Sequence, residues 1–101
     1  MGTMVYGSGY EKGFDDRTLA HLQIVIGLKL RRHEGFFFSW QSADGHYTSI
    51  WIDPSIPIRF WYQDAQHANM NSEWLERLTL ASNSSRGLYL LEEEEALAAA
   101  R

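Results

Sequence analysis

The sequence predicts an α+β domain in which a curved, mostly antiparallel five-stranded sheet packs against two helices. Two segments, beginning near Asp15 and Asn71, carry apolar residues at the spacing of amphipathic helices. Between them, residues 36–62 alternate apolar and polar side chains and are divided by two turn sequences, which is typical of paired strands. With a short strand at each end, the order is β-α-β-β-β-α-β, and both helices are expected on one face of the sheet.

The N-terminal third is expected to hold one strand and the longer helix. Residues 4–6 are the strand candidate, and the glycine-rich stretch GSGYEKG is expected to connect it to the helix. Asp15 is suited to cap that helix, and Asp16 complements the positive end of its dipole. The inward stripe consists of Leu19, Leu22, Ile26 and Leu30. Three more apolar residues lie on a different side and predict a second neighbour: Ile24, Val25 and Leu28.

A three-residue loop, Ala43-Asp44-Gly45, is expected to join the next two strands, with Gly45 in the left-handed conformation. A two-residue Asp-Gly loop would instead mix the two faces of the hairpin, so the three-residue loop gives the cleaner core. The resulting register pairs Trp40 with Thr48, Phe38 with Ile50 and Phe36 with Ile52.

The chain is expected to turn again at Asp53-Pro54-Ser55 and to add a strand beside this hairpin. Pro57 lacks a backbone donor, which places that strand at an edge or its start at a bulge. The alternate residues of this strand that are expected to face the core are Ile56, Ile58, Phe60 and Tyr62. Asn71 is expected to cap a shorter helix running through Ser84, and residues 87–91 are predicted to form the last strand. The inward side of that helix consists of Trp74, Leu75, Leu78 and Ala81.

The composition is that of one globular domain. A chain of 101 residues is long enough for a single core. It contains no cysteine, which excludes disulfides, thiolate metal sites and cysteine nucleophiles and fits a reducing compartment. No apolar run has the length of a membrane span, and the N-terminal residues do not have the pattern of a signal peptide. We therefore expect a cytoplasmic protein that does not contact a membrane.

The acidic charge is concentrated at the C-terminus. The formal net charge is -4, and removing the run Glu92 to Glu95 from the 13 acidic residues leaves nine, equal to the nine Lys and Arg residues. The expected organisation is a single domain over residues 1–91, followed by an acidic tail, residues 92–101, that is solvated or forms a frayed helix. The neutral body argues against a general nucleic-acid-binding function.

No residue pattern predicts a catalytic, metal or cofactor site. The four histidines are scattered without the spacing of metal ligands. The Gly7-Ser8-Gly9 stretch lacks the third glycine of the dinucleotide fingerprint, because Lys12 stands at that position. Helix capping explains the aspartates near His21. We therefore expect no enzymatic activity, no metal and no cofactor.

In the three consecutive strands predicted between the helices, the side chains that point away from the core are unusually aromatic. Phe37, Tyr47, Trp51 and Trp61 alternate there with Ser39, Gln41, Ser49, Arg59 and Gln63. This mixture is too aromatic for an idle surface and too polar for a second core, which is typical of a contacting face. The candidate binding residues are Phe37, Tyr47, Trp51, Arg59 and Trp61 on the sheet, with Ile24, Val25 and Leu28 on the first helix.

Two functions fit these candidates. The first is a small interaction module without enzymatic activity that binds another copy of itself, or another protein, through the aromatic outer face or the apolar first helix. The alternative is an accessory protein that holds nucleic acid or a nucleotide by stacking bases on the aromatic face beside Arg59. We favour self-association, because the sequence shows no basic groove for a phosphate backbone.

Three separated segments of the chain together resemble a known family: MGTMVYG, FDDRTLAHLQIVIGLKLRR and SIWIDPSIPIRFWY. The family consists of short uncharacterised actinobacterial proteins, some of which carry the label ATP-dependent DNA ligase. The resemblance extends to about Leu91 and implies a small free-standing domain associated with DNA metabolism. It implies no catalytic residues, because such ligases need a Lys-x-Asp-Gly motif, and Ser42 stands where the lysine before Asp44-Gly45 belongs.

Overall fold

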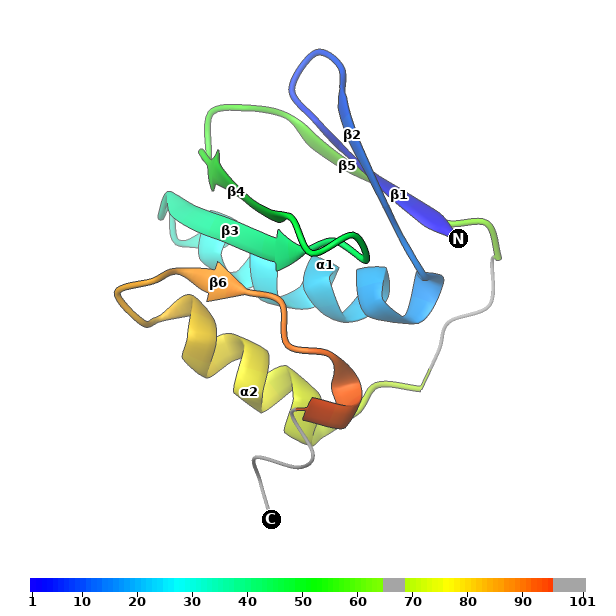
Figure 1. Cartoon of the computed structure of the whole chain (residues 1–101). Helices are drawn as coiled ribbons and strands as arrows, with labels where there is room; N and C mark the ends of the chain where they lie inside the picture. The colour runs from blue at the N-terminus through cyan, green and yellow to red at the C-terminus, as the bar shows by residue number, and fades with distance from the viewer. Residues whose placement is uncertain (65–68, 96–101) are drawn as a thin grey trace.

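The computed structural model describes residues 1–64 and 69–95 (Figure 1). Within them the elements are β1 (Gly2–Tyr6), β2 (Tyr10–Phe14), α1 (Asp16–Arg31), β3 (Phe36–Gln41), β4 (Tyr47–Ile52), β5 (Ile58–Trp61), α2 (Ser72–Ser82) and β6 (Leu88–Tyr89). The α+β class is confirmed. The six strands replace the five that were expected, and they form two three-stranded sheets in place of one.

The N-terminal sheet has the strand order β2-β1-β5 and is antiparallel throughout. The stretch expected to be a connection is a hairpin, in which Gly7 turns the chain with φ 66° and β2 pairs along the whole of β1. This strand was missed because YEKGF lacks apolar alternation, and of its residues only Phe14 is buried. β5 pairs with β1 and not with β4, since the turn at Asp53-Pro54-Ser55 and Pro57 carries the chain to the other sheet.

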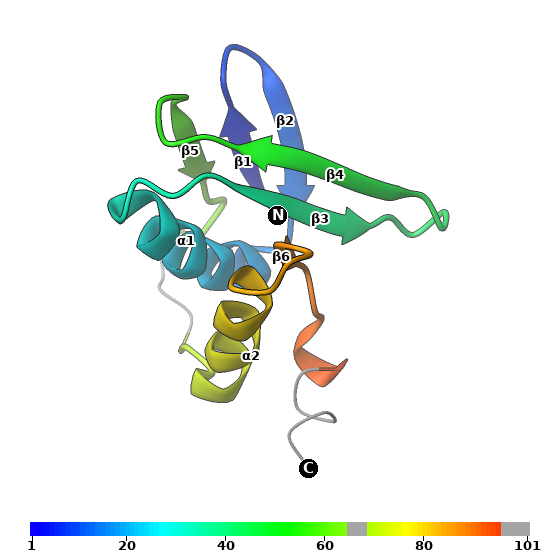
Figure 2. The same ribbon diagram turned by 90° about the vertical axis from the view of Figure 1, so that its left-hand side faces the viewer.

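The second sheet has the order β4-β3-β6. The predicted hairpin register is confirmed, including the pairs Phe36 with Ile52 and Trp40 with Thr48, and Gly45 has φ 88°. β6 pairs in parallel with β3, so Leu88 lies beside Phe38 on the buried face. Figure 2 shows the strands of this sheet crossing those of the N-terminal sheet at a steep angle.

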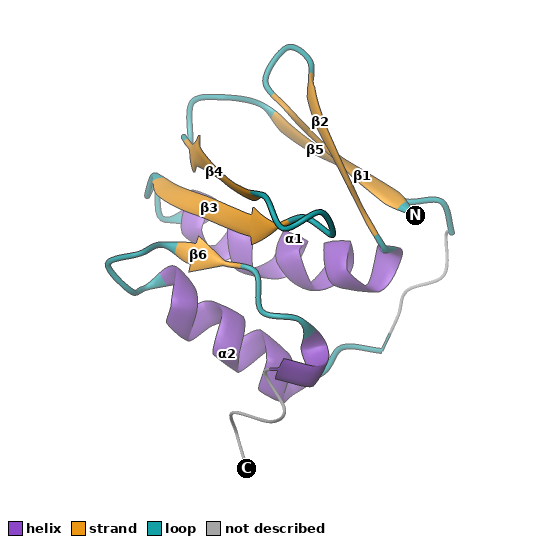
Figure 3. Cartoon of the chain, viewed as in Figure 1, coloured by secondary structure: helices purple, strands orange, loops and turns teal. Residues whose placement is uncertain are grey.

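Both helices lie on the same side of the β4-β3-β6 sheet (Figure 3). Their predicted caps are confirmed: Asp15 accepts from the Thr18 N–H, and Asn71 accepts from two N–H groups of the first turn of α2. The core between these layers includes Leu19, Leu22, Val25, Ile26, Phe36, Phe38, Trp40, Ile52, Trp74, Leu78 and Leu88. Phe14 joins the two sheets, because its ring centroid lies 6.1 Å from that of Phe38 and 6.0 Å from that of Trp40. Over the described ranges, no helix has the length and apolar character required to cross a membrane.

Candidate functional site

Three of the predicted site residues come together on the side of the β4-β3-β6 sheet that faces away from the helices. Phe37, Tyr47 and Trp51 are 50%, 58% and 48% exposed, whereas their neighbours of opposite parity are buried or half-buried. Ser39, Gln41 and Ser49 share this face, and Tyr89 joins it because it lies opposite Ser39. We call this set of seven residues the aromatic face.

The ring of Trp51 is held in place by its neighbours. It stands edge-on to Phe37, its cross-strand partner, with ring centroids 5.1 Å apart and an angle of 76° between the planes. It also covers the backbone of Gly35, where an added Cβ would lie only 2.5 Å from the indole. The indole N–H points to Asp53 at 3.4 Å. The aromatic pair is therefore ordered before any partner arrives, which reduces the entropy lost on binding.

Hydroxyl groups and one cation complete the aromatic face. The Ser39 and Ser49 hydroxyls share a hydrogen bond of 2.8 Å across the strands. The Arg86 guanidinium lies 4.5 Å from the centre of the Tyr89 ring. Ser39, and to a smaller extent Arg86, lower the pKa of the Tyr47 phenol. The face can therefore offer both apolar area and hydrogen-bond donors to a partner.

Arg59 and Trp61 do not belong to the aromatic face. Both are exposed, but β5 places them on the outer side of the N-terminal sheet, where they pair with Val5 and Thr3 of β1. The expectation of a single outer face was wrong, because it assumed that β5 continues the β3-β4 meander. The structure thus has two separate aromatic patches, and Trp61 is the exposed aromatic of the second.

The candidates on α1 are also divided. Ile24 and Leu28 are 40% and 43% exposed, so they do form a small apolar strip on the outside of the helix. Val25 is buried within the domain, so it was wrongly chosen as a candidate binding residue. It packs in the core and, with Leu28, borders a pocket whose other side is formed by Thr79 and Ser82 of α2. α2 is therefore the second neighbour that the apolar middle of α1 predicted.

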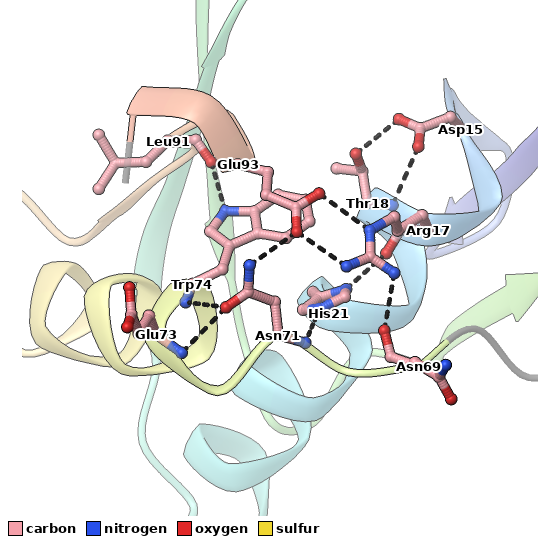
Figure 4. Close-up of polar contacts among 10 residues, drawn as sticks. All are labelled: Asp15, Arg17, Thr18, His21, Asn69, Asn71, Glu73, Trp74, Leu91 and Glu93. Atoms are coloured by element: carbon pink, nitrogen blue, oxygen red, sulfur yellow. Dashed lines mark hydrogen bonds and ion pairs between the residues drawn. The ribbon is translucent and has the colours of Figure 1, made fainter. Parts of the chain in front are cut away.

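Sequence reasoning missed a polar cluster that fastens the C-terminal segment to the two helix starts (Figure 4). Glu93 accepts from the Arg17 guanidinium at 2.9 and 2.8 Å and from the Asn71 amide at 2.7 Å. The Trp74 indole donates to the Leu91 carbonyl at 2.7 Å. We call Leu91 and Glu93 with these three partners the C-terminal clasp.

The clasp corrects the expected domain boundary after Leu91. Glu93 was expected in a tail that is solvated or forms a frayed helix. Residues 93–95 are helical, but Glu93 is bonded to the body of the domain. Residues 96–101 of the predicted tail lie outside the described residues. No signal in the sequence distinguishes Glu93 within the run Glu92 to Glu95, and nothing in its spacing identifies Arg17 as its partner.

His21 supports the clasp from beneath. It is fully buried, its Nδ1 lies 2.7 Å from the Arg17 carbonyl oxygen, and its Nε2 accepts the Asn71 backbone N–H at 2.9 Å. Because Nε2 is an acceptor, the proton sits on Nδ1, which donates to Arg17. Within the described residues, no buried side-chain polar atom lacks a partner, and no three or more His, Cys, Asp or Glu residues gather as metal ligands. These internal bonds favour a structural role for the cluster.

The pH dependence of the clasp follows from Glu93. Hydrogen bonds from Arg17 and Asn71 lower the pKa of its carboxyl to about 2, from an ordinary value of 4.5. A carboxyl whose folded pKa is depressed contributes stability above its unfolded pKa and loses that contribution as the pH falls through the folded one. The stability advantage of the wild type over Glu93→Gln is therefore expected at neutral pH and should disappear between about pH 5 and pH 2.

Urea unfolding of both chains over this pH range measures the advantage directly. Every other titrating group is common to the two chains, so the difference isolates Glu93. An advantage that stays constant down to the lowest pH would show that the ion pair does not form in solution.

The comparison with known families gives one match. A family model described as Domain of unknown function (DUF7882) matches residues 1–93. No curated protein and no solved structure matches the chain. The matched segment ends at Glu93, so it contains the whole of the clasp as well as the aromatic face.

Proposed function

Because the chain belongs to the DUF7882 family, whose description names no activity, we propose its function from its surfaces: it is an interaction module that self-associates through the aromatic face. The observation that carries this proposal is the fixed, half-exposed pair of Phe37 and Trp51 beside Tyr47. Aromatic residues dominate the binding energy of protein interfaces, particularly where they are already ordered. The seven residues of the aromatic face carry no formal charge themselves, and Arg86 lies beside them on the Tyr89 ring.

The other exposed apolar surfaces support self-association less well. Ile24 and Leu28 form a strip of only two side chains on α1. Trp61 lies on a sheet whose outer side also carries Arg59 and Glu11, so an interface there would have to bury charged groups near its centre. Charged residues are depleted in the centres of interfaces, whereas Trp and Tyr are enriched. The aromatic face is therefore the best candidate.

Substituting Trp51 by serine tests this proposal. In a twofold dimer the change removes the same contact twice, and truncation of a central aromatic typically costs about 2 kcal/mol or more, or roughly 30-fold in the dissociation constant. We expect Trp51→Ser to be a folded monomer at concentrations where the wild type is a dimer. Sedimentation equilibrium gives the mass, and far-UV circular dichroism reports the fold.

Trp61→Ser is the matched control, because it removes an equally exposed tryptophan from the other sheet. It should leave the mass of the dimer unchanged. Dissociation by Trp61→Ser but not by Trp51→Ser would place the interface on the N-terminal sheet and contradict the proposal.

A second candidate function rests on Arg86. A cation stacked on Tyr89 next to Tyr47 and Trp51 is the arrangement with which proteins hold single-stranded nucleic acid or a nucleotide. It also agrees with the association with DNA metabolism that the sequence resemblance implies. If this function is the correct one, the wild type is a monomer and Trp51→Ser lowers its affinity for an oligonucleotide.

A further inference from the structure

We infer that two copies join by antiparallel pairing of their β4 strands, which merges two β4-β3-β6 sheets into one six-stranded sheet. The inference rests on the proposed self-association and specifies its geometry. It places the aromatic faces of the two copies side by side on the same surface. The free edge of β4 carries it, because this edge is long, uncharged and bordered by the residues of the aromatic face.

The backbone of β4 presents hydrogen-bonding groups to this edge. In an antiparallel pair, residues point both their N–H and C=O groups either toward the neighbouring strand or away from it, in alternation. The Leu90 N–H donates to the Ser39 carbonyl, so the backbone groups of Ser39 point toward β6. The backbone groups of its cross-strand partner Ser49 therefore point away from β3. The Tyr6 hydroxyl donates to the Trp51 carbonyl at 2.9 Å from outside the sheet, which agrees with this alternation. Tyr47, Ser49 and Trp51 therefore direct their backbone groups outward.

Only some of the outward backbone groups of β4 have hydrogen-bond partners within the chain. Tyr6 also accepts the Asp53 N–H at 2.8 Å, so its hydroxyl covers the C-terminal end of β4. Among the described residues, β4 pairs with β3 alone, and no backbone hydrogen bond engages the outward groups of Tyr47 or Ser49. Figure 2 shows the turn between β3 and β4 at the end of the hairpin that lies farthest from β5.

The other sheet edges carry the features that block pairing, and β4 does not. Natural edges are protected by charges, prolines or short length. β2 contains Glu11 and Lys12, β5 follows Pro57 and exposes Arg59, and β6 has only two residues. β4 has six residues, YTSIWI, without a charge, a proline or a glycine. Its stretch from Tyr47 to Ser49, which Tyr6 does not cover, is thus the unprotected part of the sheet edges among the strands that the structure describes.

The sequence of β4 is also compatible with pairing to itself. With Thr48 on the twofold axis, Tyr47 lies opposite Ser49 of the second copy, so the pairing uses the part of β4 that Tyr6 does not cover. The residues with outward backbone groups then face each other, as the antiparallel ladder requires. Tyr47 then lies diagonally across from the second copy's Trp51 on the aromatic face, within the reach of aromatic side chains.

Amide hydrogen exchange followed by NMR tests the pairing without any substitution. Thr48 and Ile50 belong to the ladder with β3, so their amides should be protected at all protein concentrations. Tyr47 and Ser49 have outward amides, and their protection should rise at least about tenfold when dilute protein is concentrated into the dimer. Unchanged fast exchange at Ser49 in a sample that sedimentation shows to be dimeric would overturn the inference and leave the proposed function standing.

Ser49→Pro provides a second test. It removes the outward N–H without removing a backbone hydrogen bond to β3, and proline is tolerated at such edge positions. Ser49→Ala is the control, since it loses the same bond to the Ser39 hydroxyl but keeps the N–H. We expect a monomer for Ser49→Pro and a dimer for Ser49→Ala.

A folded Ser49→Pro protein that stays dimeric overturns the edge pairing. If Ser49→Pro does not fold, the exchange experiment decides on its own. A wild type that is monomeric at every concentration contradicts the proposed function, and the inference falls with it.

Discussion

A chain that ends at Leu90 is expected to melt far below a chain that ends at Glu93. The shorter chain loses the Leu91 carbonyl, which leaves the indole N–H of the buried Trp74 without its acceptor. It also loses the carboxylate that holds Arg17 and Asn71. An unpaired buried donor costs about 1–3 kcal/mol, and the partly exposed ion pair adds at most about 1 kcal/mol.

The apolar contact of Leu91 with the core is lost as well. We expect a total of about 3 kcal/mol, which lowers the melting temperature by more than about 10 °C for a domain of this size. Differential scanning calorimetry of the two chains measures it. Glu93→Gln in the longer chain serves as the control for the ion pair, and its loss should be the smaller part. Equal melting temperatures for the two chains would mean that the clasp does not hold the C-terminal segment.

The second large effect is expected for Gly87→Ala. Gly87 has φ 79°, and an added Cβ would lie 2.5 Å from the backbone oxygen of Phe37. Backbone cannot give way as a flexible side chain does, so β6 would have to separate from β3. Conformational strain and the clash together should cost about 3 kcal/mol or more. The same shift would disturb the aromatic face, because β6 carries Tyr89.

Gly45→Ala is a matched control for Gly87→Ala. Gly45 has a similar φ of 88°, but nothing lies within 4 Å of the position where a Cβ would be added. Its substitution should cost only the conformational strain, about 1–2 kcal/mol. Urea unfolding of both variants measures the difference. Similar losses for the two variants would show that the close contact with Phe37 is not present in solution.

Local signals in the sequence correctly predicted the helix caps, the hairpin loop and the pairing of β3 with β4. The caps at Asp15 and Asn71, and the three-residue loop at Gly45, each follow from chemistry within a few residues. The alternation of Phe36 to Gln41 with Tyr47 to Ile52 then gave the correct register and the correct outward residues of β3 and β4.

Apart from β2, whose local pattern lacks apolar alternation, the errors concern contacts between distant segments. β5 continues the apolar parity of the hairpin, yet it pairs with β1, and no local pattern distinguishes these two partners. Arg59 and Trp61 were assigned to the wrong surface for this reason. Val25 lies at a position whose burial depends on where α2 packs, and Glu93 depends on a cation 76 positions earlier in the chain. Tertiary packing decides such cases, and a single sequence does not encode them in its spacing.

Self-association through the aromatic face is the central claim, and the mass of the wild-type protein in solution tests it most directly. Sedimentation equilibrium over a concentration series up to about 100 μM detects dimers with dissociation constants up to about 100 μM. This corresponds to a binding free energy of roughly −5.5 kcal/mol. The account predicts that the mass rises with concentration toward that of two chains. A mass that stays at one chain throughout the series would contradict it.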